Sequence, residues 1–430
     1  MRQATRFFPI LLLLVYACSP VSQSALRRTF AASEKEFNDH IGFCLYDPVK
    51  KKTLAEYQSD RYFTPASNTK IFTFFSSLKI LADSIPAFYY TDEGDSLILW
   101  GSGDPGFLYK NTFDNGRTYN FLMASPRPIF LSTANFQTEP FGRGWAWDDY
   151  NYNYSPERSP LPIYGNIFSV QTKGRTLRIT PPYFRPLVTQ GDALDELELR
   201  REPWSNNTVF HPGAQNRQVT IDVPFRVESA LTTRLLADTL HRPVGQVHKM
   251  LPVSRKVFYA TPADSLYKVL MQESDNFIAE QLLLICASVL SDTLKPEITI
   301  DYIKDTYLRD LADQPVWVDG SGLSRYNLFT PRSIVQLWQK IYVLVPRERL
   351  FPLLATGGKA GTIKNWYKGN TPYIFGKTGS LSNNHCLSGY IVTKKGNTLI
   401  FSFMNSNFAK PGNEIRGNMQ RILNSIYEHY

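Results

Sequence analysis

The chain has 430 residues, of which 43% are hydrophobic and 20% charged, and its formal net charge is +9. This composition is typical of a globular protein with one large core or two to three smaller ones, and it excludes a disordered chain. The densest basic run is only Lys50-Lys51-Lys52. Because no concentrated basic patch or nucleic-acid-binding module is present, we expect no nucleic-acid partner.

The N-terminal segment predicts a targeting signal over residues 1–18. Arg2 and Arg6 precede a short apolar run that ends at Ala17, and Cys18 follows directly. The run is too short to span a bilayer and has the proportions of a secretory signal peptide. The Val-Tyr-Ala-Cys string that ends at Cys18 resembles a bacterial lipobox, so we expect lipidation of Cys18, with a plain cleaved signal as the alternative. Either signal predicts a periplasmic location in a bacterial cell envelope, with a lipid as the only membrane attachment.

The first part of the mature chain predicts a β-hairpin and then a helix. Strand patterns at 41–46 and 53–57 flank a turn at Asp47-Pro48. Pro65 then precedes a strongly periodic helix, in which Ile71, Phe74, Phe75 and Leu78 share one face.

The middle of the chain, from residue 90 to 245, is rich in Pro, Gly, Asn, Tyr and Trp. Short strand-like runs at 96–100, 176–180 and 218–223 alternate with turns, and no long amphipathic helix is predicted before 231–240. This pattern predicts a mostly β insertion.

Helical periodicity returns in the last part of the chain, followed by strands and a final helix. Helices are predicted at 265–271, after Ser274, after Thr330-Pro331 and from Ile415 to Ile426, and strands at 373–377, 386–393 and 398–404. The two terminal parts together predict an α+β fold with one antiparallel sheet flanked by helices. The expected divisions are 25–90 and 246–430 for this domain and 91–245 for the insert.

Three cysteines remain after Cys18, and we expect all of them to be buried. Cys44, Cys286 and Cys386 are widely and irregularly spaced in apolar stretches. This pattern is that of neither a disulfide framework nor a zinc site. No metal or other cofactor is predicted.

Three short strings carry the chemistry of an acyl-transfer site. They are Ser67-Asn68-Thr69-Lys70, Ser274-Asp275-Asn276 and Lys377-Thr378-Gly379, in this order. Each string alone is weak: Ser67 could be a helix cap, Lys70 an exposed lysine, and the polar residues at 274–276 ordinary caps. Their occurrence in order, each in a suitable context, favours a catalytic site.

Ser67 is the expected nucleophile and Lys70, one helical turn away, its general base. The amine of Lys70 can accept a proton only when neutral, so its pKa must fall from about 10.4 toward ~7–8. Burial and a nearby positive charge would lower it, and Lys377 is the predicted source of that charge.

The other two strings predict proton relay and substrate binding. Ser274 would pass a proton to the leaving amine, and Asn276 would hold Lys70 and bind a substrate amide. Lys377 and Thr378 would bind a carboxylate, and Gly379 would let a substrate lie against the strand edge. The amides of Ser67 and Ser380 would form the oxyanion hole.

Serine hydrolases of another design need a histidine, and the six histidines lie in no such motif. The nearest approach to a nucleophile elbow, Gly320-Ser321-Gly322, falls short of the G-x-S-x-G pattern. Gly-rich phosphate loops and H-E-x-x-H are also absent from the sequence.

The three strings are the set found in serine β-lactamases and penicillin-binding proteins. The mature chain as a whole resembles the class C low-molecular-mass penicillin-binding proteins, which are D-alanyl-D-alanine carboxypeptidases/endopeptidases. The resemblance includes the long interval between the first two strings, where this family carries inserts. It also includes Pro65–Lys70, Gly101–Pro105, Tyr164–Asn166 and Asp319–Arg325.

The resemblance implies a penicillin-recognising transpeptidase fold and a peptidoglycan stem peptide ending in D-Ala-D-Ala as substrate. It also implies an acyl-enzyme on Ser67, loss of D-Ala, hydrolysis and covalent capture by β-lactams. It assigns Ser67 as nucleophile, Lys70 as base, and the strings at 274–276 and 377–379 to the second and third motifs. Trp147-Asp148-Asp149 would correspond to an insert segment that approaches the substrate.

Two other functions remain as alternatives. A serine β-lactamase of the same fold would need a rapid deacylation route, and no Glu-x-x-x-Asn stretch is suitably placed after Ser274. A non-catalytic envelope scaffold would not need Ser67, Lys70 and Lys377 together.

Overall fold

The computed structural model describes residues 22–113, 115–173, 176–214 and 218–430. The signal peptide predicted at 1–18 and the lipidation candidate Cys18 lie outside these residues. Among the helices of the described ranges, none combines the length and the apolarity that a membrane span needs.

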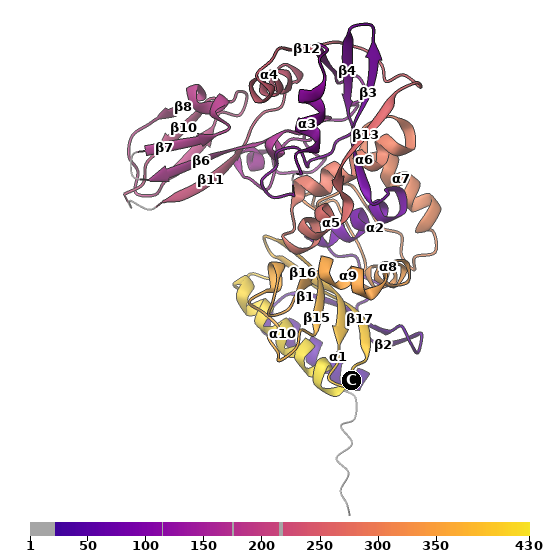
Figure 1. Cartoon of the computed structure of the whole chain (residues 1–430). Helices are drawn as coiled ribbons and strands as arrows, with labels where there is room; N and C mark the ends of the chain where they lie inside the picture. The colour runs from indigo at the N-terminus through magenta and orange to yellow at the C-terminus, as the bar shows by residue number, and fades with distance from the viewer. Residues whose placement is uncertain (1–21, 114, 174–175, 215–217) are drawn as a thin grey trace, which may run out of the picture.

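A six-stranded antiparallel sheet forms the part of the molecule that contains both ends of the described chain (Figure 1). Its strand order is β14-β15-β16-β17-β1-β2. The N-terminal hairpin and the C-terminal strands predicted from the sequence are confirmed, and pairing of β1 with β17 joins them into one sheet. The strands are β1 (His40–Asp47), β2 (Lys52–Tyr57), β14 (Ala355–Thr356), β15 (Ile374–Leu381), β16 (Asn384–Val392) and β17 (Thr398–Ser406).

Two terminal helices, α1 (Gln23–Phe37) and α10 (Gly412–His429), pack on one face of this sheet. Alternation along β1 sends Phe43 to this face, where its ring lies 4.8 Å from that of Phe30 on α1. The C-terminal helix was predicted, whereas α1 was not, because its only large apolar side chains are Leu26, Phe30 and Phe37, too few to give a clear helical pattern.

The other face of the sheet is covered by a helical layer that holds the largest hydrophobic core. Trp338 of α8 anchors this contact, since its indole N–H donates to Ser388 Oγ of β16 at 2.9 Å. Helix α8 begins where it was predicted, with the Thr330 hydroxyl accepting from Ser333 N. The layer comprises α2 (Lys70–Ile80), α5 (Ala263–Gln272), α6 (Asn276–Ser291), α7 (Pro296–Tyr307), α8 (Pro331–Leu344) and α9 (Arg347–Leu353), of which α7 and α9 were not predicted.

The insertion between the first two motifs contains three further sheets and lies on the far side of the helical layer (Figure 1). Its five-stranded sheet is made of β3 (Ser84–Glu93), β4 (Ser96–Gly101), β5 (Ile129–Ser132), β12 (Val244–Gln246) and β13 (Lys256–Pro262), with α3 (Arg117–Ala124) and α4 (Ser229–Leu240) beside it. These strands extend beyond the expected range 91–245 at both ends, because β3 and β13 pair with each other.

Two small sheets form an arm that projects from the insertion in Figure 1. One contains β6 (Ile167–Lys173), β7 (Thr176–Thr180) and β11 (Val219–Pro224), and the other β8 (Val188–Gln190), β9 (Glu198–Arg201) and β10 (Thr208–His211). The predicted β character of the insertion is therefore correct.

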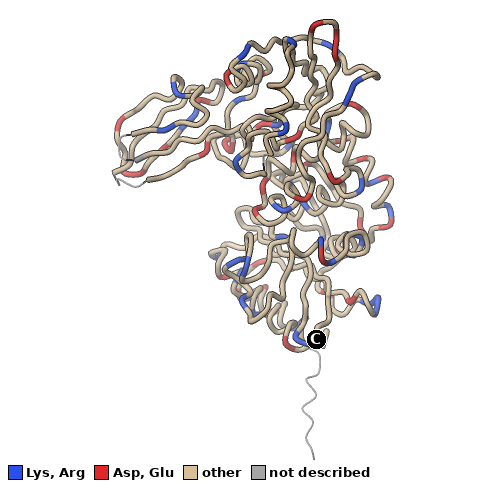
Figure 2. The backbone as a smooth tube through the Cα atoms, in the orientation of Figure 1, with Lys and Arg blue, Asp and Glu red and all other residues tan. Residues whose placement is uncertain are grey.

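Charges of both signs are spread over every part of the molecule, as Figure 2 shows. The net positive charge is therefore not gathered in one element. Cys44, Cys286 and Cys386 are buried, as the sequence predicted, and all three are free thiols. Within the described ranges, no group of three or more His, Cys, Asp or Glu is arranged to hold a metal ion.

Candidate active site

A strained turn presents Ser67 to solvent at the start of α2. Ser67 lies in a short 3-10 helix, η1 (Ala66–Thr69), in which Ala66 has a φ of +47°. A non-glycine residue in the left-handed region costs free energy and is held there by its surroundings. Gly322 packs directly against this turn. A Cβ atom at position 322 would lie 1.9 Å from the carbonyl oxygen of Ala66, so only glycine fits there.

Lys70 is fully buried, and its amine has three hydrogen-bond acceptors. Its Nζ lies 2.9 Å from Ser67 Oγ, 2.6 Å from Asn276 Oδ1 and 2.7 Å from the carbonyl oxygen of Ser321. These contacts use the whole donor capacity of an ammonium group. The first and second motifs therefore meet at one nitrogen atom.

Burial lowers the pKa of Lys70 to about 8, against the opposing charges of Asp319, Glu280 and Asp275. The direction agrees with the expectation for a general base. Burial is the largest cause, as expected, and the two lysine amines also repel each other's charge. The pKa of Lys377 is itself lowered, by burial and then by the charge of Lys70.

Lys377 joins the third motif to the second. It is fully buried on β15, and its Nζ donates to Ser274 Oγ and to the carbonyl of Thr378, both at 2.7 Å. Ser274 has a φ of +64° and precedes the N-cap of α6, which is Asp275. Ser274 is thus not a helix cap, and its hydroxyl faces the lysine instead.

Asn276 is the first residue of α6 and makes contacts with both of its amide atoms. While Oδ1 accepts from Lys70, Nδ2 donates to the backbone carbonyl of Tyr154 at 2.8 Å. Tyr154 belongs to the insertion. Asn276 therefore connects the lysine to a wall of the site that the insertion provides.

Gly379 lies against the turn that carries Ser67. A Cβ atom on Gly379 would lie 2.4 Å from the carbonyl oxygen of Pro65 and 3.0 Å from the amide nitrogen of Asn68. The missing side chain therefore makes room for η1. Thr378, beside it, bonds to the Thr362 hydroxyl, and Ser380 is exposed.

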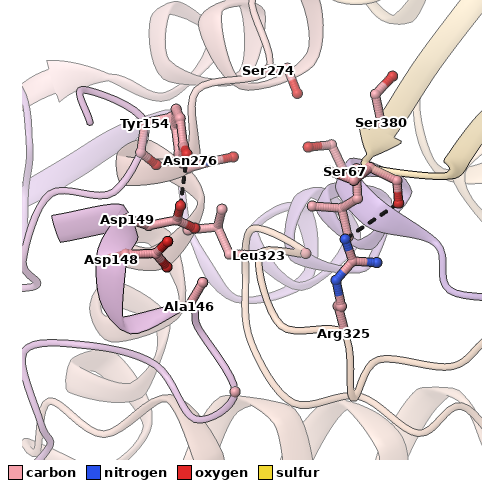
Figure 3. Close-up of a pocket in the computed structure, with 14 residues that line it drawn as sticks. Ser67, Ala146, Asp148, Asp149, Tyr154, Ser274, Asn276, Leu323, Arg325 and Ser380 are labelled. Atoms are coloured by element: carbon pink, nitrogen blue, oxygen red, sulfur yellow. Dashed lines mark hydrogen bonds between the residues drawn. The ribbon is translucent and has the colours of Figure 1, made fainter. Parts of the chain in front are cut away.

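A cavity of about 570 Å³ opens above Ser67 (Figure 3). Of the predicted residues, Ser67, Ser274, Asn276 and Ser380 line it, whereas Lys70 and Lys377 lie beneath its floor. The other lining side chains include Asp148, Asp149, Tyr154, Leu323 and Arg325.

The two walls of the cavity differ in charge. Asp148 and Asp149 of η2 (Trp147–Asn151) lie on one wall, and the Tyr154 hydroxyl donates to Asp149 at 2.8 Å. Arg325 lies on the opposite wall and bonds to the carbonyl of Ser382 at 3.3 Å (Figure 3). The segment at 147–149 was expected to approach the substrate. Asp148 and Asp149 line the cavity, in agreement with this expectation. The Trp147 side chain does not line it and is 83% exposed.

Two buried carboxylates hold the loop whose Ser321 carbonyl accepts from Lys70. Glu280 accepts from the amide of Ser321 at 2.7 Å and pairs with Arg158 of the insertion at 2.6 Å. Asp319 accepts from Gly322 N and Ser324 N, and burial raises its pKa to about 6.

Sequence reasoning missed Glu280, Arg158 and Tyr154. Arg325 and Asp319 were present only as parts of a family signature, without a role. No local pattern marks Glu280 or Arg158, because each becomes important only when α6 and the insertion pack together.

Curated relatives of this chain are carboxypeptidases. The chain is 22% identical over 410 residues to D-alanyl-D-alanine carboxypeptidase DacB of Haemophilus influenzae, a match that covers 84% of each protein. It is 24% identical over 429 residues to penicillin-sensitive carboxypeptidase A of Dictyostelium discoideum, covering 84% of this chain and 81% of the other.

The crystal structure of penicillin binding protein 4 from Haemophilus influenzae superposes on this one with a TM-score of 0.77. The match covers 93% of this chain and 99% of the other at 18% identity. It shows that the fold is the penicillin-recognising one, as the sequence predicted.

The sequence model described as the D-Ala-D-Ala carboxypeptidase 3 (S13) family matches residues 28–426, which is nearly the whole described chain. The chain is therefore a member of the D-Ala-D-Ala carboxypeptidase 3 (S13) family of peptidases.

Proposed function

We propose that the protein is a serine-type D-Ala-D-Ala carboxypeptidase/endopeptidase that acts on peptidoglycan stem peptides through an acyl-enzyme on Ser67. The observation that carries the proposal is the contact of Lys70 Nζ with Ser67 Oγ at 2.9 Å, made by an amine whose pKa is lowered to about 8. A lysine of this pKa is partly neutral near neutral pH and can therefore accept the proton of a serine.

Acylation begins when Ser67 Oγ attacks the carbonyl carbon of the penultimate residue and gives its proton to Lys70. The carbonyl oxygen becomes an oxyanion, for which the amides of Ser67 and Ser380 are the donors we assign. Both residues line the same cavity. Collapse of this intermediate breaks the C–N bond and leaves an ester on Ser67.

The proton that Lys70 received from Ser67 passes to the leaving amine through Ser274 Oγ, which is bonded to Lys377 at 2.7 Å, so Lys70 becomes neutral again. Asn276 holds Lys70 in place through its 2.6 Å contact. A water molecule then attacks the ester, gives a proton to Lys70 and releases the shortened peptide. Ser67 regains its proton in this step, so the cycle is closed.

The substrate backbone binds along the edge of β15 as an added strand. The segment from Lys377 to Leu381 pairs with β16 on one side, while β14 reaches only Phe375 and Gly376 on the other. Thr378 lines the small cavity next to Ser380 and offers a hydroxyl for the substrate carboxylate, while the buried Lys377 holds Ser274 through its 2.7 Å hydrogen bond. Among described strands, none covers this part of the edge.

The walls of the cleft suit a substrate that carries both charges. Asp148 and Asp149 can bind an ammonium group, and Arg325 a carboxylate. A stem peptide with a diamino acid side chain offers such groups. In this proposal the reaction uses only side-chain and backbone groups of the protein, so no cofactor is needed.

Covalent binding of β-lactams follows from the same site, because the strained amide acylates Ser67. The proposed location is the periplasmic side of a bacterial cell envelope, where the substrate occurs. Lipidation of Cys18 after removal of residues 1–17 would attach the enzyme to a membrane surface. A β-lactamase of this fold stays an alternative that rapid turnover of penicillin would favour.

The proposal is tested with a fluorescent penicillin and a peptide ending in D-Ala-D-Ala. We expect labelling and D-Ala release by the wild-type protein, and neither by Ser67→Ala, since no other hydroxyl replaces the nucleophile. Ser265→Ala, on α5 and away from the cavity, is the matched control and should behave as wild type. Labelling that survives in Ser67→Ala would overturn the assignment.

A further inference from the structure

Two smaller cavities adjoin the active-site cleft at the end of β15 that contains Ser380. One, of about 200 Å³, is lined by Thr362, Thr378, Trp366 and others, and the second, of about 290 Å³, by residues that include Lys410. Ser380, His385 and Arg416 line both. Since Ser380 also lines the main cleft, the three cavities meet at this residue.

Arg416 of α10 brings an unbalanced positive charge to this junction. It is half-buried, and among the described residues none forms a hydrogen bond or salt bridge with its guanidinium. None of the described residues that line the two cavities is acidic. A guanidinium in a recess without a carboxylate is suited to receive one from a ligand.

His385 does not supply the charge. Its pKa is lowered to about 3, by burial and then by the charges of Arg416 and Lys377, so the ring is neutral in the working range of pH. Its Nδ1 lies 2.8 Å from Ser380 Oγ and fixes that hydroxyl at the meeting point. The cavities therefore combine a fixed hydroxyl with a free cation, which matches a carboxylate and not an ammonium group.

We propose that Arg416 is a specificity-determining residue that binds the free α-carboxylate of the residue on the leaving side of the scissile bond. This proposal rests on the proposed acyl transfer at Ser67. A peptide bound along β15 with its scissile carbonyl at Ser67 runs past Ser380, and the leaving residue then reaches the recess. The site thereby selects leaving amines that carry a free α-carboxylate and rejects those whose carboxylate is blocked.

The test compares two peptides, N-acyl-L-Lys-D-Ala-D-Ala and the same peptide with a C-terminal amide. We expect Arg416→Gln to lower kcat/KM for the free acid by about 10- to 100-fold, the usual effect of losing one charge-assisted hydrogen bond, and to leave the amide unchanged. Arg416→Lys should recover part of the loss. Arg421→Gln, on the same helix but outside both cavities, is the matched control and should leave the preference intact.

A preference for the free acid that persists in Arg416→Gln, or an equal loss for both peptides in a variant with wild-type thermal stability, overturns the proposal. The second readout is acylation of Ser67 by benzylpenicillin and by its methyl ester, followed by mass spectrometry. This readout again compares a free carboxylate with a blocked one, but it needs only acylation of Ser67 and no turnover of a peptide. A wild-type protein that cleaves neither peptide and is not acylated by penicillin overturns the proposed function instead, so the two failures are distinguishable.

Discussion

The Nζ atom of Lys70 lies 2.6 Å from Oδ1 of Asn276, although the two residues are 206 positions apart in the chain. The contact exists because α2 and α6 pack side by side with their first residues at the same end. It holds the amine beside Ser67 in a buried environment, and this environment sets the acid–base behaviour of the site.

The rate of Ser67 acylation should rise with pH. Below its pKa of about 8, Lys70 carries a proton and cannot accept another, so the rate should increase about tenfold per pH unit and level off above pH 8. The second-order rate constant with a fluorescent penicillin, measured from pH 6 to 10, checks this expectation. A flat profile over that range would contradict the role of Lys70 as base.

Asn276→Asp should move the midpoint of this profile upward. The substitution places a carboxylate where an amide oxygen now lies 2.6 Å from Nζ, and an opposite charge at this distance favours the protonated amine. We expect a shift of at least one pH unit and a rate at pH 7 that is lower by about tenfold or more. An unchanged midpoint in a folded variant would show that residue 276 does not control the protonation of Lys70.

Gly379→Ala should impair acylation by displacing η1. The added Cβ would lie 2.4 Å from the Pro65 carbonyl, a backbone atom that cannot move aside without shifting the turn that carries Ser67. We expect a loss of one to two orders of magnitude in the acylation rate. Gly417→Ala is the control, because nothing lies within 4 Å of the new Cβ and the residue is helical, so it should be neutral or slightly stabilising. Wild-type acylation by Gly379→Ala would contradict the tight fit between β15 and η1.

Arg158→Met should destabilise the fold strongly. Arg158 and Glu280 form an ion pair in which the side chains are only 4% and 1% exposed, so removal of one partner leaves a buried charge. The expected cost is about 3–5 kcal/mol in the free energy of unfolding. Arg309→Met removes the exposed pair with Asp305 and should cost at most about 1 kcal/mol. Thermal and denaturant unfolding of the two variants measures the contrast, and equal effects would contradict it.

Asp39→Asn should stabilise the protein above pH 7. Burial and the charge of Glu34 raise the pKa of Asp39 to about 7, and one of its oxygens, Oδ1, has no hydrogen-bond partner. A carboxyl group with a raised folded-state pKa destabilises the fold when ionised, and this cost diminishes as the pH falls from 7 toward 4. We expect a gain of about 1–2 kcal/mol at pH 8 that shrinks at pH 5. Unfolding at both pH values, with the exposed Asp95→Asn as control, tests the sign; a loss of stability at pH 8 would contradict it.

Local sequence was sufficient for the elements whose pattern is strong. The hairpin at 40–57 and the start of α8 at Thr330 were predicted correctly because turn and cap residues mark them. The α7 helix was missed although it begins with Pro296, a common first helical residue. The pairing of β3 with β13 was not predicted, because it joins residues on either side of the insertion and is a long-range event.

The sequence by itself determined the family resemblance, the α+β class and the residue types of the three motifs, because short strings keep their chemistry wherever the chain carries them. Only the tertiary structure decided that Lys70 is buried, that Gly379 makes room for η1, and that Glu280 and Arg158 support the loop at Ser321. These properties depend on which distant atoms surround a side chain. Desolvation, close approach and ion pairing arise from packing, and no local pattern encodes them.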